Sequence, residues 1–445
     1  MVTTGLADEL DELVRTRAGE LGVPGVAVGV VDGERDHRCC VGSPTVDDPR
    51  PVDAATLFQI GSVSKPLTAI VVAGLVADGL LTPATRLTEV LGDTGLPDVT
   101  VGDLLSHRLG LDGDALLCRP PDDPTPAGAV AALAAADGLG APGVDFSYSN
   151  AAYSVLGRVV EVIDDRSFAE SLRRRLLRPV RLRRTVTTAD EAVTSVVALP
   201  HQSHPEGAEP IPGGMGWQPR WELGAHDTAP AGMISCLDDL LRLLTWLLGD
   251  GERPISPDER RALWEPVVAV RPGESMASGW FVRDLDGATL VGHPGVTAGY
   301  CTLLSLVPER RCGWVVLTNG TAGARLHAEI EALLLDRLLG IDLTAAEDPP
   351  PDGDAAEAVG TYVGGLGITT ITPSGDTTTL RVEHAARDDG RWQPFPDPPA
   401  EVVRHGERLI GADRDGHRVD IPLLRAPDGR IDAILRGRRR REREG

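Results

Sequence analysis

The sequence predicts a mixed α/β protein followed by a small β-barrel, and three observations support this fold class. Short β-branched runs typical of strands occur near the N-terminus and again at 278–318, whereas helical spacing of apolar residues dominates between them. Residues 342–355 are rich in Pro and Asp, which is typical of a linker. At 356–445, short alternating strands with Gly and Asp-Gly turns predict a small antiparallel β-domain. We therefore expect a first domain at 1–341, with one antiparallel sheet that is completed by distant segments and flanked by helices.

The helices and strands of the first domain follow from the spacing of its apolar residues. Residues 6–21 carry apolar positions at helical spacing, and the β-branched run 26–31 predicts a strand, with another strand expected before Asp48. A helix is predicted to begin at Ser62 and to end near Gly79, with a proline in its first turn. Further helices are predicted at 101–107, 127–137, 151–163, 168–177, 237–248 and 323–339, and further strands at 278–284, 288–292, 301–307 and 313–318.

The β-domain is predicted from short runs in which apolar and polar residues alternate, as they do in strands with one buried face. The chain then continues into a basic segment, Arg436-Gly-Arg-Arg-Arg-Arg-Glu-Arg-Glu. We interpret this segment as a solvated end, with a docking site for an acidic partner as the alternative. The predicted strands lie at 359–363, 368–371, 378–382, 408–410, 419–424 and 431–435.

The composition limits the possible functions. A formal net charge of −22 argues against a nucleic-acid or anionic-membrane surface, because phosphate binding needs clustered cations. The first residues lack the basic start and apolar core of a signal peptide, and no long apolar run could span a bilayer. The six cysteines follow no metal-binding or disulfide spacing. We therefore expect a cytoplasmic protein that needs no metal and no cofactor.

The chain contains a single lysine, Lys65, among its 44 basic residues. It follows Ser62 by three positions, so the predicted helix places its amine one turn from that hydroxyl. Arginine cannot release its proton at any useful pH, whereas a desolvated lysine can. The helix N-terminus also supplies free N–H groups that favour an oxyanion. These features predict Ser62 as a nucleophile and Lys65 as its base. The alternative is a capping serine with a solvent-facing lysine.

A second candidate group lies just before the helix predicted at 151–163. Tyr148, one of only four tyrosines, stands two residues ahead of Asn150. A phenol that is hydrogen-bonded to a lysine can hold or relay a proton. An asparagine side chain can fix the lysine or bind a substrate carbonyl. The alternative is a half-buried packing tyrosine, with Asn150 as the helix cap.

A third candidate segment, Gly292-His293-Pro-Gly295-Val-Thr-Ala-Gly-Tyr300, lies between two predicted strands. Its glycines let a substrate backbone approach, and the N–H of Val296 could then serve as a second oxyanion donor. His293 could donate to the leaving group, the intermediate or a substrate carboxylate. A structural histidine is the alternative.

Together, these motifs resemble the serine β-lactamase and penicillin-binding-protein superfamily, in which a Ser-x-x-Lys helix supplies nucleophile and base. Tyr148-Ser-Asn150 resembles the Tyr-x-Asn second motif of class C β-lactamases, related esterases and D-peptidases. His293-Pro-Gly295 resembles the His-x-Gly form of the third motif, where β-lactamases have Lys-Thr-Gly. That change favours esterase, D-peptidase or acyltransferase chemistry over β-lactam hydrolysis. The resemblance covers residues 10–340 and implies a β-lactamase-like transpeptidase domain with a helical subdomain.

The resemblance implies a serine acyl-enzyme mechanism. Ser62 attacks an acyl carbonyl after its proton passes to Lys65 or Tyr148, and the N–H groups of Ser62 and Val296 hold the oxyanion. Lys65 and Tyr148 then protonate the leaving group and activate the second nucleophile. Asn150, His293 and Gly295 complete the expected site.

With its expected cytoplasmic location and its appended β-domain, the chain resembles the penicillin-binding-protein-type thioesterases of nonribosomal peptide assembly lines. Those enzymes carry a lipocalin-like C-terminal domain. That likeness implies a peptidyl carrier protein as partner, a D-residue that acylates Ser62, and release as a head-to-tail macrolactam. The loop at 201–226, with Trp217 and Trp221, is a candidate lining of the acyl pocket. The runner-up is a cytosolic esterase or D-stereospecific peptidase that uses water as acceptor. A non-catalytic acyl-binding or sensor protein is the third class.

Overall fold

The structure is a computed structural model that describes residues 3–118, 121–211, 223–285, 287–342, 351–364, 367–375, 378–386, 399–413 and 418–444. The chain divides into two compact units. The first comprises Met1–Thr85 and Leu156–Ala345, and the second comprises Arg86–Val155 and Ala346–Gly445. Part of the helical region therefore groups with the C-terminal β-domain. Most of the predicted linker lies outside the described residues.

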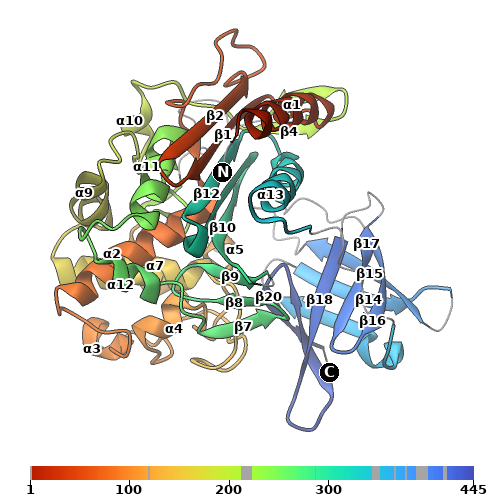
Figure 1. Cartoon of the computed structure of the whole chain (residues 1–445). Coiled ribbons are helices and arrows are strands. Elements are labelled where there is room, and N and C mark those ends of the chain that lie inside the picture. Colours follow the sequence, from red (N-terminus) through yellow and green to blue (C-terminus); the bar gives the residue numbers. More distant parts are fainter. Residues whose placement is uncertain are drawn as a thin grey trace. The chain divides into compact units, whose positions relative to one another are not determined.

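The first unit contains the predicted antiparallel sheet, with the strand order β2-β1-β12-β11-β10-β9-β8-β7 (Figure 1). Strand β1 (Gly25–Asp32) lies between β2 (Arg35–Gly42) and β12 (Cys312–Thr318), with Val28 opposite Val316. An early and a late segment of the chain thus form neighbouring strands, which confirms the expected sheet. The remaining strands of the sheet are β7 (Val268–Arg271), β8 (Glu274–Met276), β9 (Phe281–Asp284), β10 (Thr289–Thr297) and β11 (Tyr300–Val307).

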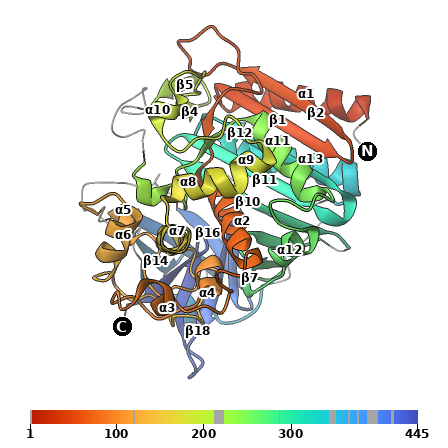
Figure 2. The ribbon, with the colours of Figure 1, turned by 90° about the vertical axis from the view of Figure 1, so that its left-hand side faces the viewer.

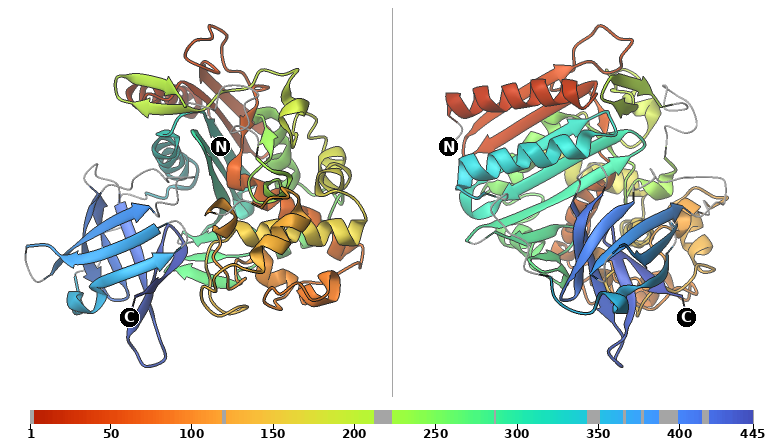
Figure 3. Two further views of the ribbon diagram at one scale, coloured as in Figure 1. Left: turned by 180° about the vertical axis from the view of Figure 1, so that it is seen from behind. Right: turned by 90° about the vertical axis from the view of Figure 1, so that its right-hand side faces the viewer.

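Helices cover both faces of this sheet. α1 (Thr4–Glu20) and α13 (Gly323–Leu339) pack side by side on one face (Figure 3), where their apolar residues and those of the sheet form one core. The amphipathic α11 (Leu237–Leu248) covers the opposite face (Figure 2). There the Leu241 methyl groups lie 2.7 Å from the position that a Cβ atom on Gly29 would occupy. A larger residue at Gly29 would therefore force these leucine side chains to repack.

The helices that the sequence predicts are confirmed, and short turns join them. Thr100 illustrates how their starts are fixed: its hydroxyl accepts the N–H of Asp103, whose carboxylate accepts the N–H of Thr100. None of the described helices is long and apolar enough to cross a membrane.

The remaining helices and strands are divided between the two units. The first unit also contains β3 (Phe58–Gln59), η1 (Gly61–Val63), α2 (Ser64–Ala77), α8 (Phe168–Leu172), η2 (Arg173–Leu177), α9 (Arg178–Val180), α10 (Ala189–Ala192), β4 (His201–His204), β5 (Gly207–Pro210), η3 (Ala225–Asp227), β6 (Ile234–Ser235), α12 (Pro257–Ala262) and η4 (Pro308–Arg310). The second unit contains α3 (Leu87–Leu91), α4 (Val101–Leu105), α5 (Ala115–Cys118), α6 (Pro126–Leu133) and η5 (Ala355–Ala358), and α7 (Asn150–Asp164) runs from the second unit into the first.

The second unit contains a closed antiparallel barrel whose strands follow chain order from β13 to β20. Pairing of β13 with β20 closes it, with Tyr362 opposite Arg443. Apolar side chains from β13 to β19 fill its interior. These features confirm the predicted β-domain. Its strands are β13 (Gly360–Gly364), β14 (Gly367–Pro373), β15 (Thr379–Ala386), β16 (Ala400–His405), β17 (Arg408–Asp413), β18 (Arg418–Arg425), β19 (Ile431–Arg436) and β20 (Arg439–Arg443).

The basic C-terminal segment forms strand β20, so its interpretation as a solvated end is wrong. It pairs with β19 on one side and with β13 on the other. Arg441 is 5% exposed and donates to the hydroxyl of Thr369 at 2.6 Å. The guanidinium carbon of Arg443 lies 5.9 Å from the ring centroid of Tyr362. An arginine stem can cover apolar surface while its head keeps polar partners, so a run of arginines can occupy a barrel strand.

Candidate active site

Ser62 and Lys65 lie at the start of the predicted helix. Ser62 belongs to the turn η1, and α2 begins two residues later. Lys65 is fully buried, and its Nζ donates to Ser62 Oγ at 3.2 Å and to the carbonyl oxygen of Pro230 at 2.9 Å. The lysine therefore faces the serine, which excludes the alternative of a solvent-facing side chain.

The chain segment at 229–233 is fixed to the same helix. The hydroxyl of Thr68 donates to one of its carbonyl groups at 2.8 Å, and the hydroxyl of Ser64 accepts one of its N–H groups at 3.2 Å. The carbonyl of Pro230 consequently keeps a constant position relative to α2. Because Lys65 is bonded to that carbonyl, its amine is held toward the hydroxyl of Ser62 rather than left to rotate.

Two glycines let β10 run directly past this turn. Gly61 has a φ of +52°, and a Cβ atom there would lie 2.7 Å from the backbone nitrogen of Val296. A Cβ atom on Gly295 would lie 2.1 Å from the carbonyl oxygen of Ile60 and 3.2 Å from the backbone nitrogen of Ser62. Neither position has room for a side chain. The backbone nitrogens of Ser62 and Val296 therefore lie at the same junction of turn and strand. Their role as oxyanion donors stays a prediction.

His293 lies in β10 and is buried, with 1% of its surface exposed. Its Nδ1 donates to the carbonyl oxygen of Pro294 at 2.6 Å, and its ring centroid lies 5.0 Å from that of Phe281. These contacts fix the ring within the strand. The assignment of His293 as a proton donor stays a prediction.

His226 and Asp227, which the sequence did not single out, lie beside Lys65. His226 Nε2 and an Asp227 carboxylate oxygen are 3.3 Å apart. Burial raises the pKa of the Asp227 carboxyl, and the charges of His226 and Lys65 oppose that rise. The only sequence signal for His226 and Asp227 is that they come just before the segment 229–233, which contains the carbonyl bonded to Lys65.

Tyr148 belongs to the second unit and lies in the loop that leads into α7. It is 7% exposed, and its backbone N–H donates to the carbonyl oxygen of Arg438 at 2.9 Å. Its ring stacks on that of His107, with 4.4 Å between the centroids. A backbone hydrogen bond and a ring contact thus fix the position of Tyr148, which the sequence predicts as catalytic.

Asn150 is the first residue of α7. Its side-chain amide donates to a carboxylate oxygen of Asp114 at 2.9 Å. The capping bond of the helix is made instead by the hydroxyl of Ser149, which accepts the N–H of Ala152 at 3.0 Å. The alternative interpretation of Asn150 as the helix cap is therefore wrong.

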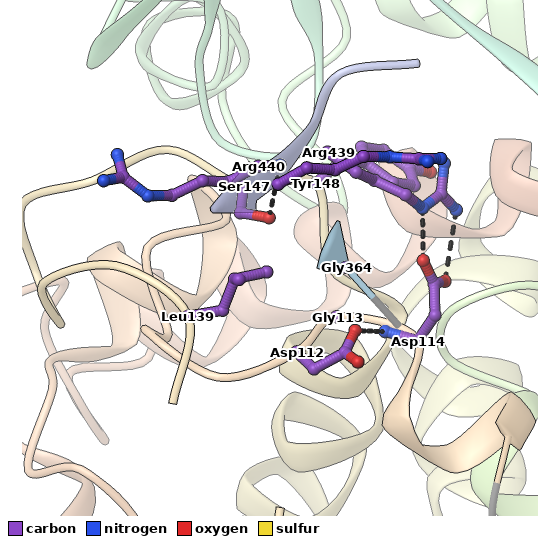
Figure 4. Close-up of a pocket in the computed structure, with 10 residues that line it drawn as sticks. Asp112, Gly113, Asp114, Leu139, Ser147, Tyr148, Gly364, Arg439 and Arg440 are labelled. Atoms are coloured by element: carbon purple, nitrogen blue, oxygen red, sulfur yellow. Dashed lines mark hydrogen bonds and ion pairs between the residues drawn. The ribbon is translucent and has the colours of Figure 1, made fainter. Parts of the chain in front are cut away.

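Asp114 and Arg439 complete this group, and the sequence analysis missed both. The Asp114 side chain is 2% exposed and forms an ion pair with Arg439 of β20. Both line a small cavity together with Tyr148, as the close-up in Figure 4 shows. The basic segment was noticed in the sequence, but nothing local indicated where its side chains lie.

The candidate residues are divided between the two units. Trp217 and Trp221, the candidate lining of the acyl pocket, lie outside the described residues. The second unit holds Tyr148 and Asn150, and the first holds Ser62, Lys65, His293, Gly295 and Val296.

Comparison with known proteins agrees with these motifs. A family model described as Beta-lactamase matches residues 10–338. Penicillin-binding protein 4 of Amycolatopsis lactamdurans is 31% identical over 364 residues, which cover 76% of this chain and 93% of that protein. Esterase EstB of Burkholderia gladioli is 32% identical over 312 residues, which cover 61% of this chain and 78% of that protein.

Solved structures share the fold at lower identity. The crystal structure of SurE has a TM-score of 0.76 at 22% identity and covers 99% of this chain and 98% of SurE. A class C β-lactamase has a TM-score of 0.64 at 17% identity and covers 75% of this chain and 97% of that enzyme. The family match spans most of the sequence and includes each of the three motifs. The chain therefore belongs to the β-lactamase family, within the superfamily of serine hydrolases and acyltransferases that contains the penicillin-binding proteins.

Proposed function

We propose that this chain releases a nonribosomal peptide from a carrier-protein thioester by head-to-tail macrolactamisation, with Ser62 as the acylated residue. The acyl-enzyme part of the proposal depends on one observation. The amine of the only lysine is fully buried and lies 3.2 Å from Ser62 Oγ. A base within hydrogen-bond reach of a hydroxyl is what a serine nucleophile requires.

The first step transfers the peptidyl group to the enzyme. Ser62 Oγ gives its proton to Lys65 or to the phenolate of Tyr148 and attacks the thioester carbonyl. The carbonyl oxygen becomes an oxyanion, which the N–H groups of Ser62 and Val296 stabilise. When the carbon–sulfur bond breaks, the sulfur leaves with the carrier protein as a thiolate, which takes up the proton that the base received from Ser62. The product is a peptidyl ester on Ser62.

The second step closes the ring. The N-terminal amine of the same peptide attacks the ester carbonyl and loses a proton to the base. The ester bond then breaks, Ser62 Oγ recovers its proton, and an amide joins the two ends of the peptide. Tyr148 is proposed to carry protons in both steps, because its phenolate can accept a proton from Ser62 or from the attacking amine, and the phenol that results can donate it to the leaving group.

Two comparisons support a peptide substrate with a D-residue. The likeness to SurE, a penicillin-binding-protein-type thioesterase, spans 99% of this chain, so it includes the C-terminal barrel as well as the family domain. A structure of SurE with D-Leu is also similar, with a TM-score of 0.74. The proposed partner is a peptidyl carrier protein, and a carrier-bound peptide would be met in the cytoplasm, the compartment that the sequence predicts.

The likeness to Esterase EstB supports a second candidate, in which water takes the place of the amine. Such an enzyme would be an esterase or a D-stereospecific peptidase. The two candidates share the acylation step and differ only in the nucleophile that attacks the ester on Ser62. The products therefore distinguish them.

The test incubates the full chain with a peptidyl N-acetylcysteamine thioester that ends in a D-residue. The expected product is one water lighter than the linear acid and has no free amine, as mass spectrometry and amine labelling would show. A matched peptide that ends in the L-residue is expected to react more slowly. Ser62→Ala is the control, and it should form neither the product nor the acyl-enzyme mass. Linear acid as the sole product across several peptides would establish the hydrolase instead.

A further inference from the structure

The buried carboxylate of Asp114 joins two distant segments of the chain beside the Tyr148 loop. It is 2% exposed, accepts the side-chain amide of Asn150 at 2.9 Å, and uses both oxygens to pair with Arg439 (Figure 4). A carboxylate is stable in such a place only when it is paired and hydrogen-bonded. Asn150 and Arg439 consequently hold each other in position through this one carboxylate.

Arg439 also lies against the ring of Tyr148. The guanidinium carbon is 5.1 Å from the ring centroid, within the range at which a cation interacts with an aromatic ring. Backbone bonds keep strand and loop in register: Tyr148 donates to the carbonyl of Arg438 at 2.9 Å, and the N–H of Arg440 donates to the hydroxyl of Ser147 at 3.1 Å. A fixed positive charge so close to a phenol favours its phenolate form.

The guanidinium stays charged in this setting. Burial lowers the pKa of Arg439, but the negative charge of Asp114 and its hydrogen bonds outweigh burial, so the net shift is upward. Burial holds the pKa of the neighbouring Tyr153 phenol well above its usual value, so that group stays neutral. Besides Asp114, the titratable groups near Tyr148 and Arg439 in the described part of the chain include His107, Asp112, Tyr153, Arg440 and Arg441.

We propose that Asp114 and Arg439 are positioning residues that hold Tyr148 and Asn150 in place for catalysis, and that Arg439 also favours the phenolate of Tyr148. The C-terminal barrel thereby contributes to acyl transfer through its strand β20. The inference rests on the proposed function, because Tyr148 and Asn150 act in catalysis only if Ser62 forms an acyl-enzyme. Asp114 contacts Asn150 and Arg439 contacts Tyr148, so both residues act through these two side chains.

The test measures how fast Ser62 is acylated by the p-nitrophenyl ester of N-acetyl-D-leucine, followed as the release of p-nitrophenol at a series of pH values. The variants are Arg439→Gln, Arg439→Lys and Asp114→Asn. Arg443→Gln is the matched control, because Arg443 lies on the same strand and over another tyrosine, Tyr362, within the barrel. It therefore reports what loss of barrel stability alone does to the rate.

Arg439→Gln and Asp114→Asn are each expected to slow acylation about 10- to 100-fold, as small misplacements of catalytic groups do. The acid limb of the pH profile should move to higher pH in Arg439→Gln and stay in place in Arg439→Lys, which keeps the charge. Combining Arg439→Gln with Asp114→Asn should cost less than the product of the two single losses, because the residues act as one unit. Arg443→Gln is expected to lower the melting temperature and to keep the wild-type rate and pH profile.

Two results would overturn the inference. One is an Arg439→Gln protein with the wild-type rate and pH profile, and the other is an equal loss in Arg443→Gln. If Arg439→Gln does not fold, Arg439→Lys decides, since slower acylation with an unmoved acid limb supports the proposal and an unchanged rate contradicts it. Failure of the proposed function looks different: the wild-type protein itself would form no acyl-enzyme with this ester or with peptidyl thioesters, and the inference would fall with it.

Discussion

The backbone nitrogen of Val296 lies 2.7 Å from the position that a Cβ atom on Gly61 would occupy. The turn that contains Ser62 and the strand that passes it therefore meet backbone to backbone. A site built in this way depends on residues that have no side chain. The predicted oxyanion donors are backbone N–H groups, which only a proline substitution removes directly. Other mutations can weaken them only by changing how closely the two segments approach each other.

Gly295→Ala is expected to open this junction, because the new methyl group would lie 2.1 Å from the carbonyl oxygen of Ile60. Loss of one oxyanion donor slows acyl transfer by about 10²- to 10³-fold, and we expect an acylation rate lower by that factor. The measurement is the burst of p-nitrophenol in a single turnover.

Gly19→Ala is the matched control for Gly295→Ala. A Cβ atom at Gly19 has no neighbour within 4 Å, and the residue lies in α1. Alanine favours a helix by up to about 1 kcal/mol over glycine, so this variant should be at least as stable as the wild type and equally fast. Equal acylation rates in Gly295→Ala and Gly19→Ala would show that the junction does not form the oxyanion hole.

Lys65→Arg keeps the positive charge and removes the proton that can be exchanged. Acylation of Ser62 is expected to fall by about 10²- to 10⁴-fold, the range for loss of a general base. Intact-protein mass spectrometry after brief exposure to an activated ester gives the fraction of acyl-enzyme. Lys65→Met, which lacks both charge and base, should be equally slow. A fast Lys65→Arg beside a slow Lys65→Met would mean that the site needs only the charge.

His293→Asn separates two roles of the buried histidine. Asparagine can still donate to the carbonyl of Pro294 but has no counterpart of Nε2. Because the ring is 1% exposed and Nδ1 is bonded within its own strand, we expect acylation to stay within about threefold of wild type. His293→Leu, which loses the donor as well, should be slower and less stable. A loss of about 10²-fold or more in His293→Asn would instead support His293 as the proton donor that the sequence predicts.

His327 makes the first unit sensitive to acid. Burial lowers its pKa to about 3, whereas a histidine in the unfolded chain titrates near 6.5. Below about pH 6.5 the unfolded chain binds a proton that the folded chain does not, so stability should fall by up to about 1.4 kcal/mol per pH unit until the folded pKa is reached. Urea midpoints measured between neutral and acid pH give this slope. His327→Leu should have a shallower slope, and an unchanged slope would contradict the assignment.

Most of the fold could be predicted from local patterns, because its elements bury apolar residues at regular spacing. The strand expected at 26–31 and the one at 313–318 are indeed neighbours in the sheet. Strands β4 to β8, β16 and β20 were not predicted, and β4 and β5 lie in a segment that the sequence analysis took as a loop. β20 consists wholly of charged residues, and only its partners in the barrel make it a strand.

The candidate site could be predicted only in part. Lys65 was identifiable because its residue type is unique in the chain and its spacing from Ser62 is that of one helical turn. Asp114 and Arg439 carry no such signal. They are 325 positions apart, and an ordinary aspartate and one arginine among many gain their roles only from the fold that brings them together.

The separation of Asp114 and Arg439 in the sequence affects how the enzyme folds during its synthesis. Residues 86–155 leave the ribosome long before those from 346 onward, yet both form one compact unit. Contacts between such distant segments form late, because closing a long loop costs entropy before any contact stabilises it. The loop that carries Tyr148 is therefore expected to stay unfinished throughout translation of the intervening segment. We therefore expect that Ser62 of a nascent chain is not yet acylated by substrate. Acyl transfer should begin only after the barrel has closed.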